Sequence, residues 1–246
     1  MLNGQIRAII WDYDGTLVDT RRKNLLVTRK IVEQVTGKDA REFLALQSLE
    51  SYMIATKNST NWRELYQAEF GMTDPQTDQS GWLWTEYQIQ DSTPVPFYDG
   101  LGEVLATLRQ LPQGIVSQNA RQNIANTLQV YGLSEYFSCI IGFEEVALQR
   151  QKPEPDGLLH CIAQLTGWTS GQVVYIGDHE TDVRCARNAN VELRKQQVDL
   201  RIISIGVSYG FETNPARWNF PPDYTATTPQ EILHLVECLQ SQNTSA

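Results

Sequence analysis

Short apolar runs alternate with amphipathic stretches along most of this chain. The run Ile6–Trp11 is mostly apolar and rich in Ile, which predicts a buried strand. Beyond it, the pattern predicts strands at 114–117, 139–143, 173–177, 201–207 and near Tyr224, and helices at 100–111, 120–131, 154–167, 181–190 and 229–240. Strands that alternate with helices are typical of βαβ units. We therefore expect an α/β fold, with a Rossmann-like parallel sheet as its core and helices on both faces of the sheet.

One segment breaks this alternation directly after the first strand. From about Arg21 to about Gln90 the apolar positions recur at helical spacing, and strand patterns are scarce. The aromatic residues spaced in this way are more typical of a core than of a ligand platform; they are Trp62, Tyr66, Phe70, Trp82, Trp84 and Tyr87. The stretch "STPVPFYDG", residues 92–100, has the composition of a linker. We expect a core domain of residues 1–19 and 96–246 and an inserted all-helical domain of residues 20–95.

A second irregularity lies near the end of the core. The stretch "NANVELRKQQVDLRIISIGV" is longer than the usual connection between a helix and the next strand. We expect residues 188–200 to form an extended loop.

The charge and the cysteines narrow the class of protein. The 246 residues include 20 Lys and Arg against 29 Asp and Glu, which gives a net charge of −9. A chain this acidic has no bulk attraction for nucleic acid or an anionic membrane, so we expect neither as a partner. The four cysteines are spaced neither as a zinc site nor as a disulfide framework. Neither a signal-peptide pattern nor an apolar run of about 18 residues is present, so we expect a cytoplasmic protein.

Polar side chains follow four of the predicted strands. The carboxyl ends of parallel strands meet at one edge of a sheet, and ligands bind there. We therefore expect these side chains to lie close together. The four stretches are Asp12-Tyr13-Asp14-Gly15-Thr16, Ser117 in "GIVSQN", Lys152-Pro153 in "RQKPEPDG", and Gly177-Asp178 with Asp182 in "VVYIGDHETD".

These residue types suit one chemistry. Asp12, Asp178 and Asp182 would concentrate negative charge, which is tolerable where a divalent cation binds, and hard oxygen ligands favour Mg²⁺. A magnesium ion held by one or two carboxylates usually completes its shell with water and a substrate phosphate. The Ser117 hydroxyl and the Lys152 ammonium group suit phosphate oxygens. Together the four stretches supply the groups that phosphoryl transfer requires.

The same four stretches resemble the motifs of the haloacid dehalogenase-like hydrolase superfamily. "DYDGT" is similar to its first motif, Ser117 to its second, Lys152 to its third and "GDHETD" to its fourth, and the order and spacing agree. The resemblance covers nearly the whole chain. A helical insertion between the first two motifs resembles the cap domain of the subgroup that includes phosphoglycolate phosphatases.

The resemblance assigns roles to the two acids of the first motif. Asp12 would be the nucleophile and would form an aspartyl-phosphate. Asp14 would protonate the leaving oxygen and then activate water, which requires a raised pKa or a shared proton at the start. An acid at the second position also favours phosphate ester chemistry over dehalogenation.

The remaining roles follow from the same resemblance. Asp12, the backbone carbonyl of Asp14 and Asp178 would bind the metal. Asp14, Ser117 and Lys152 would contact the transferring phosphoryl group, and Ser117 and Lys152 would thus be catalytic as well. Asp182 would support the metal ligands or bind the metal occasionally, and Thr16 would hydrogen-bond the turn near Asp14 or only cap it.

Several residues stay open at this level. Asn is common directly after the second-motif Ser or Thr, whereas here Gln118 precedes Asn119, which leaves Asn119 between a substrate contact and a structural role. His179 could hydrogen-bond within the outer part of the site or lie in a surface loop. Glu180 could contact a metal-bound water.

We therefore expect a Mg²⁺-dependent phosphatase that acts on a small phosphorylated metabolite, phosphoglycolate-like or a sugar phosphate, as a monomer or a homodimer. One alternative is a sugar phosphomutase with the same core, whose aspartyl-phosphate would be shielded from water. The other is a non-catalytic binding protein on this fold, which the presence of every motif acid disfavours.

Overall fold

The chain divides into two compact units, and the computed structural model describes residues 4–209 and 214–241. The core unit comprises Met1–Asp19 and Phe97–Ala246, and the helical unit comprises Thr20–Pro96.

The core unit is built on a six-stranded sheet in which every neighbouring pair of strands is parallel. The strand order is β3-β2-β1-β4-β5-β6, so the first strand lies in the middle. The strands are β1 Ile6–Trp11, β2 Gln113–Val116, β3 Cys139–Ile141, β4 Gly171–Gly177, β5 Leu200–Val207 and β6 Tyr224–Ala226. The predicted parallel α/β fold is therefore confirmed.

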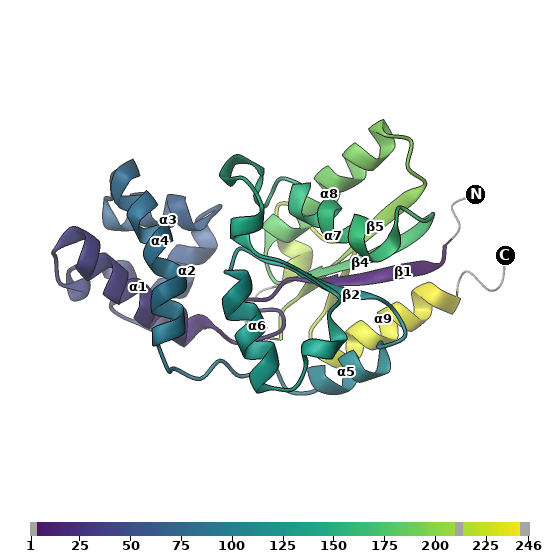
Figure 1. Cartoon of the computed structure of the whole chain (residues 1–246), viewed down its shortest axis with the longest axis horizontal. Helices are drawn as coiled ribbons and strands as arrows, with labels where there is room; N and C mark the ends of the chain where they lie inside the picture. Colours follow the sequence, from purple (N-terminus) through teal and green to yellow (C-terminus); the bar gives the residue numbers. More distant parts are fainter. Residues whose placement is uncertain (1–3, 210–213, 242–246) are drawn as a thin grey trace. The chain divides into compact units, whose positions relative to one another are not determined.

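Helices cover both faces of this sheet, as predicted. They are α5 Leu101–Thr107, α6 Arg121–Val130, α7 Asp156–Thr166, α8 Glu180–Lys195 and α9 Pro229–Ser241. Figure 1 shows α7 and α8 on one face and α5 and α9 on the other. Successive side chains of β1 point to opposite faces. Ile10 thus packs in one cluster with Leu158 of α7 and Ala186 of α8, while the Trp11 indole donates to Gln113, whose amide in turn reaches the backbone of α5.

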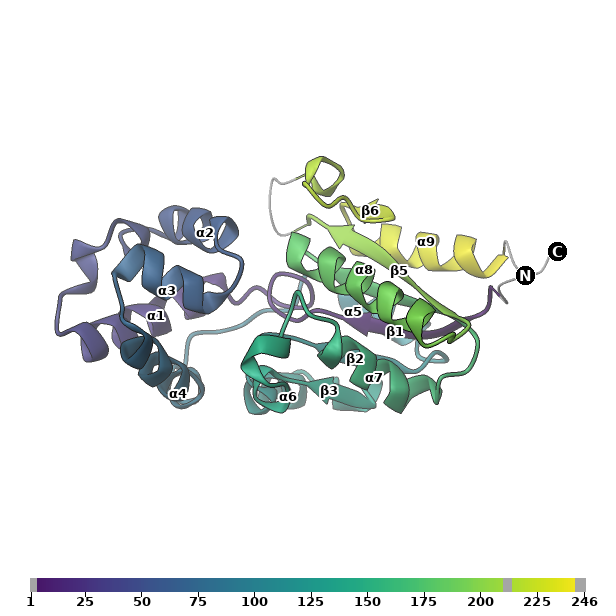
Figure 2. The same ribbon diagram turned by 90° about the horizontal axis from the view of Figure 1, so that it is seen from above.

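The expected loop over 188–200 is wrong, because most of it is helix. Helix α8 runs to Lys195 and β5 begins at Leu200, so only four residues join them. Figure 2 shows α8 as one helix beside β5. The apolar residues Val183, Ala186, Ala189 and Leu193 are buried and recur every three or four residues, which is the spacing of a helix face. The polar residues between them concealed this period in the sequence.

The helical unit contains four α-helices within its described residues. They are α1 Arg21–Thr36, α2 Leu49–Asn58, α3 Trp62–Phe70 and α4 Asp74–Gln90. Their core includes edge-to-face aromatic pairs such as Tyr66 with Phe70, whose ring centroids lie 5.3 Å apart. Trp82 departs from the expectation of an aromatic core, since its side chain is 80% exposed on α4.

The chain leaves and re-enters the core unit at adjacent points. Val18 and Phe97 form an antiparallel bridge. Next to it, the backbone N–H of Tyr98 donates to the carbonyl of Leu17 at 3.2 Å. The helical unit is thus an insertion whose two ends are pinned together in the core unit.

None of the helices within the described residues is both long enough and apolar enough to span a bilayer.

Candidate active site

Strand register brings three of the predicted residues to one edge of the sheet. Trp11 at the end of β1 pairs with Ile115 of β2 and with Ile176 of β4. Asp12 directly follows Trp11, and its backbone N–H donates to the carbonyl of Ile176 at 2.8 Å. Ser117 and Asp178 each lie two residues beyond the partners of Trp11. The carboxyl ends of these adjacent central strands therefore place Asp12 between the other two residues.

A buried lysine joins two of the acids. The Lys152 ammonium group lies 2.7 Å from Oδ1 of Asp12 and 2.7 Å from Oδ1 of Asp182. All three residues are buried. Lys152 comes from the segment that precedes α7, and Asp182 from the first turn of α8. One cation thus links the end of β1 to the N-terminus of α8.

The Tyr175 side chain contacts both Lys152 and Asp182. Its hydroxyl donates to Oδ1 of Asp182 at 3.0 Å, and the Lys152 nitrogen lies 5.3 Å from the centre of its ring. Tyr175 is buried and lies on β4, two residues before Gly177. Its contacts fix Asp182 and Lys152 relative to the sheet.

Burial dominates the electrostatics of these groups. It raises the pKa of Asp12 to about 7, an effect that Lys152 opposes and that Asp182 and Asp14 reinforce. Burial alone would lower the pKa of Lys152. The attraction of the Asp12 and Asp182 carboxylates is stronger than this effect of burial and holds the Lys152 pKa above its usual value. The lysine is therefore charged, whereas burial favours the protonated form of Asp12.

Asp14 is held by two residues that follow β2. The Asn119 amide nitrogen donates to Oδ1 and Oδ2 of Asp14 at 3.1 and 3.2 Å, and the Ser117 hydroxyl donates to Oδ2 at 3.4 Å. The two acids of the first motif thus have separate partners. Asp12 contacts the lysine, whereas Asp14 lies on the side of Ser117.

Gly15 allows the first-motif turn to approach Asp178. Its φ of +79° is in the left-handed region, and a Cβ at this position would lie 2.1 Å from Oδ2 of Asp178. Burial and then the charge of Asp12 raise the pKa of Asp178 well above its usual value. Within residues 4–209 and 214–241, the Asp178 carboxylate forms no ion pair, although Asp12 and Asp182 lie beside it.

The acidic cluster fits a divalent cation. Asp12, Asp178 and Asp182 each offer a carboxylate oxygen, and these oxygens lie within 4.8 Å of one another. Two of these acids are buried and Asp178 is half-buried, and the one lysine beside them pairs only with Asp12 and Asp182. A further cation would relieve the remaining repulsion, and carboxylate oxygens suit a hard ion. Because Lys152 and Tyr175 both contact Oδ1 of Asp182, Asp12 and Asp178 are the acids best placed to bind it.

Thr16 lies in the turn but makes a different contact from those expected. Its side chain is buried, and its hydroxyl has no hydrogen-bond partner within the described residues. Its backbone carbonyl instead accepts a hydrogen bond from the hydroxyl of Tyr209. The Tyr209 ring packs edge-on against the Tyr98 ring, with the ring centroids 5.0 Å apart. Tyr209 thereby supports the turn that carries Asp14 and Gly15.

The two polar residues beside Asp178 have structural partners. The Nδ1 atom of His179 accepts from the backbone N–H of Thr181 and so caps α8. An oxygen of Glu180 accepts from the backbone N–H of Asn219 at 2.7 Å.

Sequence reasoning did not single out Tyr175 or Tyr209. Tyr175 stands in a continuous apolar strand, where a tyrosine is indistinguishable from a core residue. Its position two residues before Gly177 was the only indication, since alternate strand residues share a face. Tyr209 lies far from the first motif in sequence, and only the tertiary structure brings it to Thr16.

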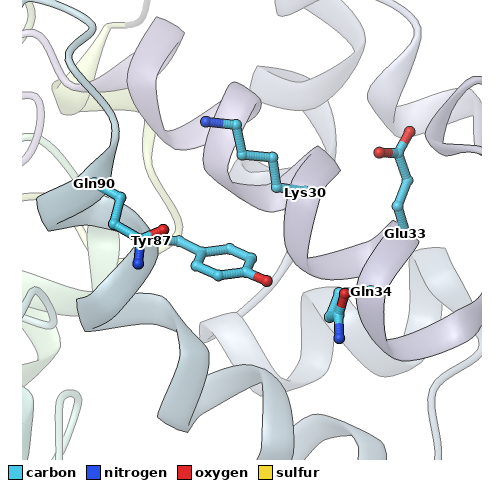
Figure 3. A pocket seen from close by; sticks show the side chains of 5 residues that line it. All are labelled: Lys30, Glu33, Gln34, Tyr87 and Gln90. Atoms are coloured by element: carbon cyan, nitrogen blue, oxygen red, sulfur yellow. The ribbon is translucent and has the colours of Figure 1, made fainter.

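A separate pocket lies in the helical unit, between α1 and α4. It measures about 500 Å³ and is lined by Lys30, Glu33, Gln34, Tyr87 and Gln90 (Figure 3). None of these residues was predicted to take part in the chemistry. Lys30 pairs with Asp91 at 2.7 Å, which leaves no unpaired cation in this lining to attract an anion.

Comparison with known proteins decides the family. The model of the family described as "Haloacid dehalogenase-like hydrolase" matches residues 9–194, which include every predicted site residue. This chain belongs to that family. It is therefore an enzyme of the hydrolase class, as expected from its motifs.

Individual relatives of this hydrolase match nearly its full length. It is 26% identical to a phosphoglycolate phosphatase from Synechococcus elongatus, over 96% of this chain and 100% of that protein. It is 24% identical to an N-acetylmuramic acid 6-phosphate phosphatase from Pseudomonas aeruginosa, over 95% of this chain and 96% of that protein. A crystal structure of a putative phosphoglycolate phosphatase from Lactobacillus plantarum has the same fold, with a TM-score of 0.71. The two sequences are 19% identical, and the match covers 94% of this chain and 99% of that chain.

Proposed function

We propose that this hydrolase is a Mg²⁺-dependent phosphatase that cleaves a small phosphate monoester through an aspartyl-phosphate on Asp12. The observation that carries the proposal is the arrangement at the end of β1. Asp12 contacts the buried Lys152, and Asp14, two residues later, is held on the other side by Asn119 and Ser117. A nucleophile and a proton donor are thus positioned separately.

The first half-reaction uses both acids. A carboxylate oxygen of Asp12 forms a bond to phosphorus, and the bond from phosphorus to the ester oxygen breaks. Asp14 gives its proton to that departing oxygen, so the product leaves as an alcohol and not as an alkoxide. Ser117 and Lys152 bind the phosphoryl oxygens, and Lys152 keeps Asp182 as a counterion when Asp12 becomes an acyl phosphate.

The second half-reaction regenerates the enzyme. Asp14, now ionised, accepts a proton from the water molecule that attacks phosphorus. The bond between phosphorus and the Asp12 oxygen breaks, and inorganic phosphate leaves. The same residue thus serves as acid and then as base, which restores the initial protonation state.

The metal site completes the charge balance. Asp12, the backbone carbonyl of Asp14 and Asp178 would hold Mg²⁺, with Asp182 beside them. When bound, the ion neutralises carboxylates and phosphoryl oxygens and lets these anions approach each other. The half-buried carboxylate of Asp178, which has no ion-pair partner in the described part of the chain, supports this assignment, because a charge partly withdrawn from water is costly without a partner.

The helical unit is proposed as the cap that selects the substrate. It is inserted between Asp14 and Ser117 in sequence, and its two ends are pinned at Val18 and Phe97. Both full-length relatives named above are phosphatases of small phosphorylated acids, a glycolate and a sugar acid. A phosphate monoester of similar size, phosphoglycolate-like or a sugar phosphate, is the proposed substrate class.

The test is phosphate release from a panel of esters, with Mg²⁺ and with a chelator. The panel contains phosphoglycolate, sugar phosphates, pyrophosphate and 4-nitrophenyl phosphate. The wild type should release phosphate only with the metal, and Asp12→Asn should lower the rate by at least about 1,000-fold. Asp99→Asn, an exposed acid in the core unit, is the matched control and should keep full activity. Retention of activity by Asp12→Asn would overturn the mechanism.

The same assay separates the phosphomutase alternative. A mutase would convert a sugar phosphate to its isomer and release little inorganic phosphate, because the acyl phosphate is then shielded from water. A phosphatase should release one phosphate for each ester consumed, without forming an isomer. Measuring the sugar phosphates before and after reaction distinguishes the two outcomes.

A further inference from the structure

We propose that Asn119 is the residue that positions Asp14 for proton transfer. Its side chain would hold the carboxyl group of Asp14 toward the leaving oxygen without contacting the substrate itself. This inference rests on the proposed function, since it assumes that Asp14 is the acid and base. It would assign a role to a residue that the sequence left between a substrate contact and a structural role.

The orientation of the Asn119 amide follows from its backbone neighbour. The backbone N–H of Ala120 lies 2.8 Å from Oδ1 of Asn119, and a backbone N–H can only donate. That end of the amide must therefore be the oxygen. The opposite end is the nitrogen, and it lies 3.1 and 3.2 Å from the two carboxylate oxygens of Asp14. Asn119 is thus a donor to Asp14.

A second side chain supports the same orientation. The amide nitrogen of Asn123, in the first turn of α6, lies 3.2 Å from the same Oδ1 of Asn119. Both asparagines are buried, at 3% and 9% exposure. The Asn119 amide is therefore held in one orientation by two donors before any substrate arrives.

The backbone of Asn119 is also fixed on both sides. Its N–H donates to the Ser117 hydroxyl at 3.0 Å, and its carbonyl accepts from the N–H of Phe143 at 3.1 Å. The first contact ties it to β2, and the second to the segment after β3. A residue anchored in this way can hold a neighbour with little loss of its own freedom.

Asp14 is the group in the site that benefits from such a hold. It is less buried than Asp12, and it does not share the lysine that fixes Asp12. The contact from Asn119 reaches both of its oxygens, whereas the Ser117 hydroxyl reaches one of them at 3.4 Å. Loss of the amide would remove the contacts that reach both oxygens of the Asp14 carboxyl group.

The test uses esters whose leaving groups differ in their need for a proton. An alkyl alkoxide leaves slowly unless it is protonated, whereas 4-nitrophenolate leaves without a proton. We expect Asn119→Ala to lower kcat/KM for the best alkyl phosphate about 100-fold and that for 4-nitrophenyl phosphate less than about 5-fold. The ratio kcat/KM is used because it does not depend on the later hydrolysis of the acyl phosphate.

Two further variants keep the test decisive. The aspartate of Asn119→Asp has nearly the same shape as asparagine and can still accept the hydrogen bond from Ala120. It presents an oxygen to Asp14 in place of the amide nitrogen, so we expect the same selective loss of kcat/KM on alkyl phosphates. This variant gives the answer even if Asn119→Ala folds poorly. Gln122→Ala changes an exposed residue of α6, the helix that follows Asn119, and should leave the rates with both substrates unchanged. Urea unfolding of each variant confirms that the folded protein is being compared.

The outcomes separate this inference from the proposed function. Selective loss on alkyl phosphates in Asn119→Asp supports the positioning role. An equal loss on both esters, or no loss on either, overturns that role, because a substrate contact or a structural role would not depend on the leaving group. If the wild type shows no metal-dependent release, or if Asp12→Asn keeps its activity, the proposed function fails instead.

Discussion

Lys152 shows how one side chain links stability and chemistry in this protein. Its ammonium group lies 2.7 Å from both Asp12 and Asp182, and all three residues are buried. A buried pair contributes little net stability when it is intact, but removing one partner leaves an uncompensated charge. The lysine therefore stabilises the folded arrangement of the two acids, and the proposed mechanism also uses it to bind the phosphoryl group.

Replacement of this lysine should destabilise the protein in a metal-dependent way. We expect Lys152→Met to lower the free energy of unfolding in chelator by about 3 kcal/mol. Mg²⁺ should recover part of the loss, because a second cation then compensates Asp12. Urea unfolding with and without Mg²⁺ measures both effects. Lys195→Met removes an exposed lysine and is the control; an equal effect of the two variants would contradict the expectation.

Gly15 tests how tightly the turn must approach Asp178. We expect Gly15→Ala to lower kcat/KM about 100-fold, because a Cβ would displace the Asp178 carboxylate or the turn. Gly167→Ala is the matched control, since Gly167 also has a positive φ but nothing within 4 Å of its Cβ position. That control should cost about 1 kcal/mol of stability and no activity. If both variants keep full activity, the close approach is not required.

Among single residues, those at strand ends could be placed from the sequence, whereas those that meet across the fold could not. The carboxylates after β1 and β4 could be placed because their strands end at one edge. Tyr175 could not be recognised, since a buried strand contains tyrosines for packing alone. The contact between Asn119 and Asp14 depends on the turn after β2, whose geometry no periodicity describes.

The connection between α8 and β5 is the element for which the sequence prediction was wrong. Asn188 and Asn190 disfavour a helix interior, and this made the helix appear to end near residue 190. Tertiary contacts overcome that preference. The Asn190 amide donates to the carbonyl of Ile202 and accepts from its N–H, both at 2.8 Å. Strand β6 does not pair with this part of β5, so the Asn190 side chain supplies the hydrogen-bond partners that a neighbouring strand would otherwise supply.

This clamp predicts a stability effect without an effect on catalysis. We expect Asn190→Ala to lower the free energy of unfolding by about 2 kcal/mol, since it leaves a buried N–H and C=O without partners. Its kcat/KM should not change, because the clamp lies at the far end of α8 from Asp182. Arg194→Ala, an exposed change on the same helix, should alter stability by less than about 0.5 kcal/mol. Equal effects in urea unfolding would show that the clamp contributes nothing.

The whole molecule is two units with separate cores, one built on the sheet and one from helices. This division could be predicted from periodicity. A segment of about 70 residues, whose apolar positions recur at helical spacing, interrupts the alternation of strands and helices. The expected end of the insertion followed from the prolines of the linker at residues 92–100. The substrate that the proposed cap would select could not be predicted, because a few side chains of the cap would decide it.

Metal binding should act on one unit only. A ligand that binds the native state suppresses the local openings of the segments it contacts. We expect Mg²⁺ to slow amide hydrogen exchange in residues 12–16 and 177–182 of the core unit and to leave helices α1 to α4 unchanged. Asp178→Asn should abolish this protection. Uniform slowing across both units would argue against a metal site at the end of β1.

The covalent intermediate on Asp12 is the central claim, and it can be observed directly. The enzyme is mixed with Mg²⁺ and an ester that it hydrolyses, and the reaction is quenched in acid. Borohydride is then added, which reduces an aspartyl-phosphate to homoserine. Peptide mass spectrometry then locates the change. We predict homoserine at position 12 in the wild type, and none when the ester or the metal is left out. Substrate turnover without modification of Asp12, or with modification of another acid such as Asp14 or Asp178, would contradict the proposed mechanism.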